Sequence, residues 1–471
     1  MEFTDIEITD EQCIVCQKPR PKEGDINGGF YPIQGHKLYI CNAHLSAFSI
    51  GVGIGHTELN AKVIHALGNI DDEATGWDVK QHVYDIIPLA RRQVQEYRRM
   101  LRIPIKSPRD IYQELDISVV GQADAKRAIS IAVFEHVRQL RDFDTSVAPD
   151  KHNILLLGPS GSGKTLLAHT VARTLELPFV SADATSFSPT GFQGADADSM
   201  ITDLYQRSRG VVPTAERGVV FLDELDKLGT YYGGNSSRTE FFNMSTQNSL
   251  LRLIEGKRVK VPTGQQFGET VNVNTEKMLF FFGGAFPGLV DIIAKLKGYS
   301  GKKMGFRTDD SDKMEVAMRN YEMLVNADTD TMVQALIEYG MGAELVGRIP
   351  VIVPLAPLNK DELRQCLLEL DHSPIPRQKW LFGESGFQID FEEEVIDKIV
   401  DTAYKMATGT RALNSLVKRA VSQAAFDLLV GPTRKKQGRI VITPDCLFDP
   451  SQYRQEAKRA SRQSQRAQNQ A

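Results

Sequence analysis

One short glycine-rich stretch constrains this chain more than any other part of its sequence. The apolar run Ile154–Leu157 precedes the stretch and predicts a buried strand, and residues 166–175 after it predict a helix. Strand, glycine-rich turn and helix are together the context of a phosphate-binding loop, or P-loop. The stretch fits G-x-x-x-x-G-K-[ST] at every fixed position and consists of Gly158, Pro159, Ser160, Gly161, Ser162, Gly163, Lys164 and Thr165.

Each part of this loop has a physical task in binding a nucleotide. The glycines let the backbone curl so that successive N–H groups point at phosphate oxygens, and the helix N-terminus adds partial positive charge. Lys164 is expected to reach the β- and γ-phosphates, and the Thr165 hydroxyl to hold Mg²⁺. The alternative is a glycine-rich turn that binds nothing, which the agreement of strand, loop and helix disfavours.

Two adjacent carboxylates follow a second apolar run at residues 219–222. Asp223 is predicted to steady Mg²⁺ through water, and Glu224 to orient the attacking water. Such a pair can be an ordinary solvated turn, but after a P-loop at a domain-scale distance it completes a site for ATP hydrolysis. The sequence therefore predicts an ATPase with ATP and Mg²⁺ as cofactors.

Length, charge and hydropathy narrow the class of protein further. A chain of 471 residues is too long for one ordinary core, so two to four domains are expected. The net charge of −4 gives no global basic field for nucleic acid. No apolar run approaches ~20 residues, and the first residues lack the apolar core of a signal peptide. We therefore expect a cytoplasmic protein without membrane contact.

Three of the cysteines are clustered near the N-terminus. Cys13 and Cys16 form a CxxC pair, and Cys41 and His44 form a CxxH pair. Two ligand pairs on two turns suit tetrahedral Zn²⁺, and the metal would supply much of the folding free energy of so small a segment. The alternatives are a reduced CxxC with an unrelated surface histidine, and His36 as the fourth ligand in place of His44.

Composition and periodicity divide the chain into five segments. Prolines at 104 and 108, and again at 354 and 357, mark two boundaries. Between them apolar strand-like runs alternate with helical patterns, which predicts an α/β fold with a parallel sheet. The segments are a zinc-binding module (1–50), a helical connector (51–106), a large α/β subdomain (107–355), a smaller, mostly helical subdomain with a proline-containing insert at 374–376 (356–450), and a disordered basic tail (451–471).

With these segments in order, the chain resembles the ClpX family, the AAA+ unfoldases that feed the ClpP peptidase. The resemblance implies an AAA+ P-loop fold and an active homo-hexamer. It covers about residues 108–449 and rests, beyond the P-loop, on V-V-G-Q at 119–122, N-S-L-L-R-L-I-E-G at 248–256, F-G-G-A-F at 282–286, E-L-V-G-R-I-P at 344–350 and G-T-R at 409–411.

The resemblance also implies roles for single residues. Val120 and Gln122 lie in the stretch that packs around adenine in the family. Arg348 matches the arginine that reaches the γ-phosphate bound by a neighbouring subunit, and Arg411 matches the arginine that senses nucleotide from the small subdomain. Phe192 stands at the tyrosine of the pore loop, where an aromatic ring grips the translocating chain. The structural alternatives are an exposed Gln122 at a helix start, surface ion pairs for the arginines and a core position for Phe192.

Two segments depart from the family pattern. Residues 262–269 contain no basic residue where the family carries a basic R-K-H loop that helps to select substrates. The absence of basic residues disfavours recognition of a negatively charged chain terminus. Met304, Gly305 and Phe306 lie where the family presents aliphatic-Gly-Phe to ClpP, but Met replaces a branched residue and Arg307 replaces a glycine. This segment either docks a ClpP-like peptidase or forms a plain turn.

Four functions are compatible with these patterns. The motifs favour an unfoldase that pulls protein substrates through a hexameric pore for a ClpP-like peptidase. The same motor acting alone as a remodelling chaperone is a close alternative. A nucleic-acid AAA+ ATPase has only the zinc module and the basic tail in its favour. A silent ring scaffold is disfavoured by the intact set of Lys164, Asp223, Glu224, Arg348 and Arg411.

Overall fold

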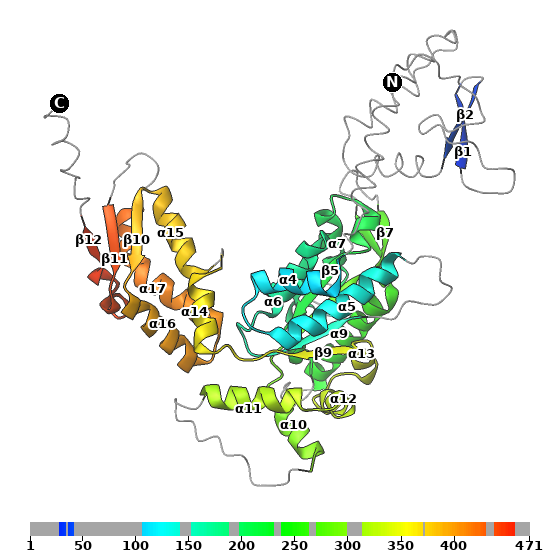
Figure 1. Cartoon of the computed structure of the whole chain (residues 1–471). Helices are drawn as coiled ribbons and strands as arrows, with labels where there is room; N and C mark the ends of the chain where they lie inside the picture. The colour runs from blue at the N-terminus through cyan, green and yellow to red at the C-terminus, as the bar shows by residue number, and fades with distance from the viewer. Residues whose placement is uncertain are drawn as a thin grey trace.

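A computed structural model of the chain describes two N-terminal strands and most of the chain from residue 106 onward. The described residues are 28–33, 36–41, 106–141, 152–187, 197–229, 237–262, 270–298, 313–370, 373–429 and 438–456. Figure 1 shows a large subdomain, coloured cyan to green, and a small subdomain, coloured yellow to red, to one side of it. The segment between β9 and α14 joins the two.

The centre of the large subdomain is a five-stranded sheet with the strand order β4-β5-β8-β3-β9, and every neighbouring pair in it is parallel. The predicted strands at 154–157 and 219–222 are β3 and β5, so the α/β expectation is confirmed. The strands are β3 (Ile154–Leu157), β4 (Phe179–Asp183), β5 (Val219–Asp223), β8 (Leu279–Gly284) and β9 (Val351–Pro354).

The central strands are apolar along their whole length because both faces of the sheet are covered. Ile154 and Leu156 point into the core on one face, whereas Leu155 and Leu157 point into the core on the other. The same alternation runs along β5 and β8. Successive side chains on a strand point to opposite faces, so a sheet covered on both sides needs apolar residues at every position.

Different helices cover the two faces. One face is covered by α4 (Pro108–Ser118), α5 (Ala123–Arg141) and α6 (Lys164–Thr174). Helix α4 begins at a capping box, in which Ser107 and Asp110 each accept a backbone N–H of the other. The other face is covered mainly by α7 (Ser199–Arg207), α8 (Val212–Ala215), α9 (Ser237–Gly256), α10 (Leu289–Leu296), α12 (Thr329–Glu338) and α13 (Ala343–Gly347).

Smaller elements complete the large subdomain. An antiparallel pair of strands lies beside α7 and α8, and α11 lies beside α10. The elements are β6 (Arg258–Pro262), β7 (Thr270–Asn274), α11 (Lys313–Val325) and the 3-10 turns η1 (Ala184–Ser186), η2 (Leu225–Leu228) and η3 (Thr275–Lys277).

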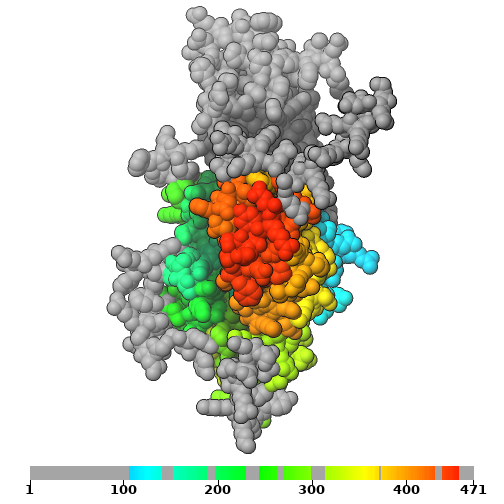
Figure 2. All heavy atoms as spheres, turned by 90° about the vertical axis from the view of Figure 1, so that its left-hand side faces the viewer, coloured from blue at the N-terminus to red at the C-terminus, as the bar shows by residue number. Residues whose placement is uncertain are grey.

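The small subdomain has a hydrophobic core of its own. Figure 2 views the molecule from the side on which the small subdomain lies, so that the yellow-to-red surface of this subdomain faces the reader. In its three-stranded sheet, β10 is parallel to β11, and β11 is antiparallel to β12. The elements are α14 (Lys360–Leu368), α15 (Pro374–Glu384), β10 (Phe387–Phe391), α16 (Glu393–Met406), α17 (Thr410–Leu428), β11 (Gly438–Ile442), η4 (Pro444–Leu447), η5 (Pro450–Gln452) and β12 (Arg454–Glu456).

Two details of the small subdomain differ from the sequence expectation. Pro374 opens α15, so the prolines at 374–376 begin a helix and do not interrupt one, because the first helical position needs no N–H donor. Strand β12 lies inside the stretch expected to be disordered from 451 onward, and Arg454 pairs with Glu392 at 3.4 Å. The first residues of the basic tail therefore belong to the sheet of the small subdomain.

Two strands are described near the N-terminus. β1 (Gly28–Ile33) and β2 (His36–Cys41) form an antiparallel pair in which Gly28 lies opposite Cys41. The rest of the predicted zinc module, and the connector as far as residue 105, lie outside the described residues. In the part of the chain that the structure describes, no helix combines the length and apolarity needed to cross a membrane.

Candidate nucleotide site

The P-loop connects the carboxyl end of β3 to the start of α6. Gly163 caps α6 with a left-handed backbone at φ 98°, which a side chain would disfavour. This turn aims the first N–H groups of α6 out of the end of the sheet, where an anion is attracted by the helix N-terminus. The Thr165 side chain in the first turn is exposed and can take part in binding an ion.

The Lys164 side chain lies folded against the loop. Its Nζ donates to the carbonyl oxygens of Gly158 at 2.8 Å and Pro159 at 3.0 Å, and the residue is only 8% exposed. Burial holds the pKa of the Lys164 ammonium below its usual range, while the carboxylates of Asp223 and Asp226 act in the opposite direction. The ammonium of Lys164 is therefore already partly desolvated, and two loop carbonyl oxygens hold it close to the place where the phosphates would bind.

Three carboxylates lie at the end of β5. Asp223 ends the strand and accepts the backbone N–H of Glu224 at 2.9 Å. Glu224 has a left-handed backbone at φ 58°, which costs a non-glycine residue about 1–3 kcal/mol and sets its exposed side chain apart from the strand. The sequence reasoning missed Asp226, which is 2% exposed and whose pKa is raised by burial. Its spacing after Asp223 in the D-E-L-D run was the available signal.

The residues predicted to contact adenine lie beside the P-loop. A Cβ placed on Gly163 would lie 3.6 Å from Val119 Cγ1, and Val120 is half-buried. Gln122 is buried, not exposed, and its carboxamide forms hydrogen bonds with the main chain of Ala356. The adenine hypothesis therefore depends on the apolar surface and main chain of this segment, because the carboxamide of Gln122 has other partners.

A crevice opens between the P-loop and the small subdomain. The P-loop contributes one wall, and the segment after β9 and the loop between α16 and α17 contribute the others. Met314 of α11 also lines it, which sequence reasoning missed because no motif marks that position. The lining residues are Pro159, Ser160, Gly161, Ser162, Met314, Pro357, Leu358, Ala407 and Gly409.

The small subdomain touches the P-loop directly at this crevice. The Thr410 N–H and the Thr410 hydroxyl each lie 3.3 Å from the Gly161 carbonyl oxygen and donate to it. A Cβ on Gly161 would collide with the Thr408 carbonyl at 2.5 Å, so only glycine allows this close approach. The positive charge of the exposed Arg411 contributes to the lowered pKa of Lys164. A Cβ on Gly161 would also lie 3.3 Å from the Arg411 backbone nitrogen, so the structure brings the Arg411 backbone to the P-loop.

Arg348 lies at the other end of the sheet. It precedes β9, whose first residue, Val351, lies opposite Ile154 at the amino end of β3. Its guanidinium contacts Glu255 of α9, at 3.1 Å from Nε and 2.8 Å from the second terminal nitrogen. Such a surface ion pair is the structural alternative that the sequence left open for this arginine, although sequence reasoning did not name Glu255, which lies in the motif at 248–256, as the partner.

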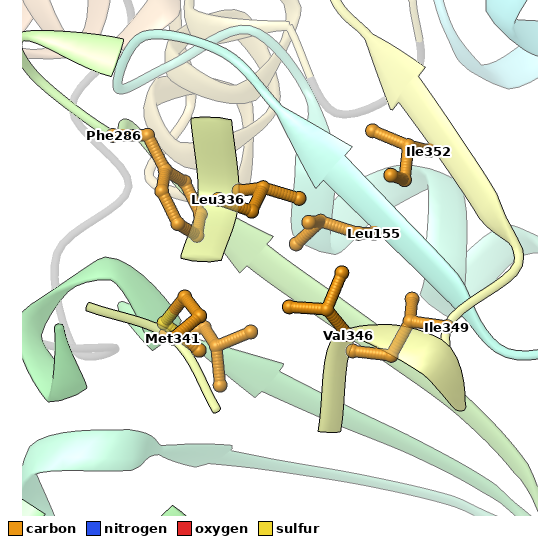
Figure 3. Close-up of a pocket in the computed structure, with 8 residues that line it drawn as sticks. Leu155, Phe286, Leu336, Met341, Val346, Ile349 and Ile352 are labelled. Carbon is orange, nitrogen blue, oxygen red and sulfur yellow. The ribbon is translucent and has the colours of Figure 1, made fainter. Parts of the chain in front are cut away.

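The main chain at Arg348 is firmly held. The buried Asn153 side chain donates to the Arg348 carbonyl at 2.8 Å. Figure 3 shows Val346 and Ile349, on either side of it, facing Leu155 of β3 across a small apolar pocket. Because this pocket is part of the core of the large subdomain, α13 has a fixed place against the sheet.

Several predicted site residues lie outside the described part of the chain. They are Phe192 of the predicted pore loop, Met304, Gly305 and Phe306 of the predicted docking segment, and the predicted zinc ligands Cys13, Cys16 and His44. Cys41 ends β2, where only its backbone is described. Within the ranges that the structure describes, no group of three or more His, Cys, Asp or Glu side chains could hold a metal ion.

The sheet, the P-loop after β3 and the acidic residues after β5 define a P-loop ATPase of the AAA+ class. Residues 150–352 match the family model described as AAA domain (Cdc48 subfamily). The chain is 33% identical over 359 residues to the ATP-dependent Clp protease ATP-binding subunit ClpX 3 of Methylococcus capsulatus, covering 73% of this chain and 80% of the relative.

A second relative gives the same result. The ATP-dependent Clp protease ATP-binding subunit ClpX of Borrelia duttonii is 32% identical over 354 residues, which cover 73% of this chain and 79% of the relative. The chain therefore belongs to the ClpX family of AAA+ ATPases. The family resemblance and the ATPase class predicted from the sequence are confirmed.

Proposed function

We propose that the chain is an ATP-driven protein unfoldase and translocase that works as a ring, with six copies as in the family. The position of Arg348 carries the proposal. The P-loop follows the carboxyl end of β3, and Arg348 precedes the amino end of the parallel neighbour β9. Four strand residues separate the two ends by ~10 Å or more. The guanidinium is therefore far better placed to complete the site of an adjacent copy than its own.

Phe192 is the residue proposed to grip the substrate. The segment that contains it joins η1, the turn that follows strand β4, to α7. An aromatic ring gives contact that does not depend on the substrate sequence, as a translocating motor requires. Movement of this segment with the ATP-driven motion of the sheet would pull on a chain in the pore.

Two variants of Phe192 test this function. Phe192→Ala is expected to keep ATP turnover within about twofold and to stop unfolding of a stable fluorescent protein substrate, because the substrate contact is lost. Phe192→Tyr, which installs the residue of the family, is the matched control and should unfold the substrate normally. Undiminished unfolding by Phe192→Ala would remove this residue from the mechanism.

A ClpP-like peptidase is the proposed partner of the ring. The support is the printed name of both relatives, each a Clp protease ATP-binding subunit, and the position of Met304, Gly305 and Phe306 in the sequence. Met can fill an apolar cleft as a branched residue does. Arg307 in place of a glycine favours the second candidate, a remodelling chaperone that works without a peptidase.

A Glu224→Gln variant separates these candidates. It should bind ATP without hydrolysing it, since the carboxylate that orients the water is lost, and so hold its partners. Capture of substrates together with a peptidase supports the protease motor. Capture of proteins alone supports the remodeller, and capture of nucleic acid alone contradicts both.

We also propose that Cys13, Cys16, Cys41 and His44 hold a structural Zn²⁺. The support is the spacing of the two ligand pairs and the mixed thiolate and imidazole donor set, which zinc accepts. Removal of zinc with a chelator should then increase amide exchange in the first 50 or so residues and leave exchange in the sheet unchanged. Unaltered N-terminal exchange after metal removal would refute this site.

A further inference from the structure

The short turn formed by Gly121 and Gln122 connects the P-loop region to the segment 355–359, which joins β9 to α14 and is called the hinge between the two subdomains. Gln122 has a left-handed backbone at φ 58° and is 7% exposed. Its Nε2 donates to the Ala356 carbonyl at 2.7 Å, and its Oε1 accepts the Ala356 N–H at 2.9 Å. One side chain thus pairs with both polar groups of a single hinge residue, as a neighbouring strand would.

The same turn also meets the first helix of the small subdomain. A Cβ placed on Gly121 would lie 2.2 Å from Glu362 Oε1, so the carboxylate of Glu362 occupies the space that a side chain would take. Glu362 accepts the Asn359 N–H at 2.8 Å, and Asn359 Oδ1 accepts the Glu362 N–H at 2.9 Å. The capping box that starts α14 therefore packs on Gly121.

On its other side the turn is fixed to the nucleotide site. Val119, two residues before Gly121, lies against Gly163 of the P-loop. The Gln122 carbonyl accepts the Lys126 N–H at 2.9 Å in the first turn of α5. Lys126 is 1% exposed and pairs with Asp116 of α4 at 2.7 Å. These contacts fix the turn to the large subdomain, so the hinge is the part that can move relative to it.

We propose that Gln122 is a positioning residue for ATP hydrolysis, holding the hinge at Ala356 in the place where the small subdomain can complete the site. The small subdomain contributes Thr410, which donates to the Gly161 carbonyl, and Arg411, whose backbone lies beside Gly161. Both depend on the angle of the hinge. The carboxamide of Gln122 acts on the hinge and does not read the base. This inference rests on ATP hydrolysis, which the family establishes, and is independent of protein unfolding.

The prolines around Ala356 make the contact unusually easy to measure. Between Pro354 and Pro357 only Leu355 and Ala356 carry backbone N–H groups. The Leu355 N–H donates to Leu157 at 2.7 Å inside the sheet, and the Ala356 N–H donates to Gln122. Amide exchange resolved to single residues in 354–357 therefore reports the hinge contact at one position and an internal reference at its neighbour.

The experiment compares Gln122→Ala and Gln122→Glu with the unaltered full-length chain. Gln122→Ala should speed exchange at Ala356 by about tenfold or more and leave Leu355 unchanged, since a buried hydrogen bond is lost. Gln122→Glu keeps the acceptor for the Ala356 N–H and loses the donor to its carbonyl, so intermediate exchange is expected. Gln334→Glu, at an exposed position on α12, controls for the added charge.

Nucleotide kinetics on the same variants provide the functional readout. Gln122→Ala should lower kcat for ATP about 10- to 30-fold, as expected for two lost buried hydrogen bonds, while the Kd of a fluorescent ATP analogue changes less than about threefold. Unchanged kcat despite faster Ala356 exchange would overturn the proposal. A weaker Kd with lost preference for ATP over GTP and normal kcat would also overturn it, because Gln122 would then read the base.

Discussion

The two ends of the central sheet carry the P-loop and Arg348, which we propose as the two halves of a nucleotide site shared between copies, and the two ends are built in contrasting ways. At the carboxyl end, Lys164 and Asp226 are 8% and 2% exposed and lie among apolar strands. At the amino end, the Arg348 side chain is 52% exposed and pairs with Glu255, which is 41% exposed. An exposed pair contributes about 0–1 kcal/mol, so it can exchange partners easily. The contrast supports two different tasks. The buried residues of the P-loop end would bind the chain's own nucleotide, and the exposed Arg348 would reach the nucleotide of another copy.

The contrast concerns the side chains and not the main chain. Asn153 and the apolar residues around the pocket in Figure 3 hold the backbone around Arg348 against the sheet. A fixed backbone with a weakly held guanidinium delivers the charge to a defined place while leaving its last partner open. That is what an arginine serving a neighbouring copy needs.

Loss of the buried P-loop lysine should have the largest effect on ATP binding. Lys164→Ala removes charge-assisted hydrogen bonds to the phosphates, each worth about 1.5–3 kcal/mol. We expect ATP affinity to fall up to about 10⁴-fold, so that binding of a fluorescent analogue and ATP turnover are both lost. Lys295→Ala, at an exposed lysine of α10, is the matched control. Turnover retained by Lys164→Ala would mean that the P-loop is not the site.

Loss of the exposed Arg348 side chain should remove ATP turnover but spare ATP binding. Arg348→Ala is expected to lower ATP turnover by about 10³-fold with an unchanged Kd, since the arginine acts on the transition state. Arg348→Lys should not restore it, because an ammonium lacks the planar fork of donors. Mixing Arg348→Ala chains with Glu224→Gln chains should restore part of the turnover, because intact sites form between unlike copies. No restoration would place Arg348 on its own chain's site.

Replacement of Asp226 tests whether its buried carboxylate lowers the free energy of unfolding. Burial raises the pKa of its carboxyl above the usual 3.8. Between 3.8 and that raised value the folded state binds more protons than the unfolded state, so stability contributed by this group falls as pH rises through the window and stays lower at neutral pH. Asp226→Asn should therefore raise the free energy of unfolding at pH 7 by about 1 kcal/mol.

Urea unfolding at pH 7 and near pH 4 measures this difference. The gain from Asp226→Asn should shrink at the lower pH, because the raised pKa leaves a larger fraction of Asp226 protonated in the folded chain than in the unfolded chain there. A variant less stable than the unaltered chain at pH 7 would show that the carboxylate stabilises the fold, in contradiction to its burial.

The smallest effect is expected at the exposed pair. Glu255→Gln removes the charge that holds Arg348 on its own chain, and the free energy of unfolding should change by less than about 1 kcal/mol. ATP turnover should stay within about threefold, because the arginine leaves Glu255 to act. A tenfold loss of turnover would make Glu255 part of the site and would abolish the contrast between the two ends.

Much of the site was predictable because its motifs are local. A strand, a glycine turn and a helix are contiguous at 154–174, and the acidic pair directly follows its own strand, so the hydrophobic pattern and the motif fall together. Met314 and Glu255 were missed because a single apolar or acidic residue carries no spacing that distinguishes it. Asp226 was missed although it follows Asp223 in the D-E-L-D run. The tail boundary at 451 was misplaced because polar β12 is an edge strand without an apolar signal of its own.

The sequence by itself determined the chemistry of this protein: a P-loop lysine, the carboxylates after a buried strand and the motifs of an AAA+ ATPase. Tertiary structure alone decided which distant groups meet. Gln122 reaches a hinge residue 234 positions away, and Thr410 reaches the P-loop across 249 positions. The parallel sheet places Arg348 at the end opposite Lys164. Such pairs depend on the packing of whole subdomains, and no local pattern of residues encodes that packing.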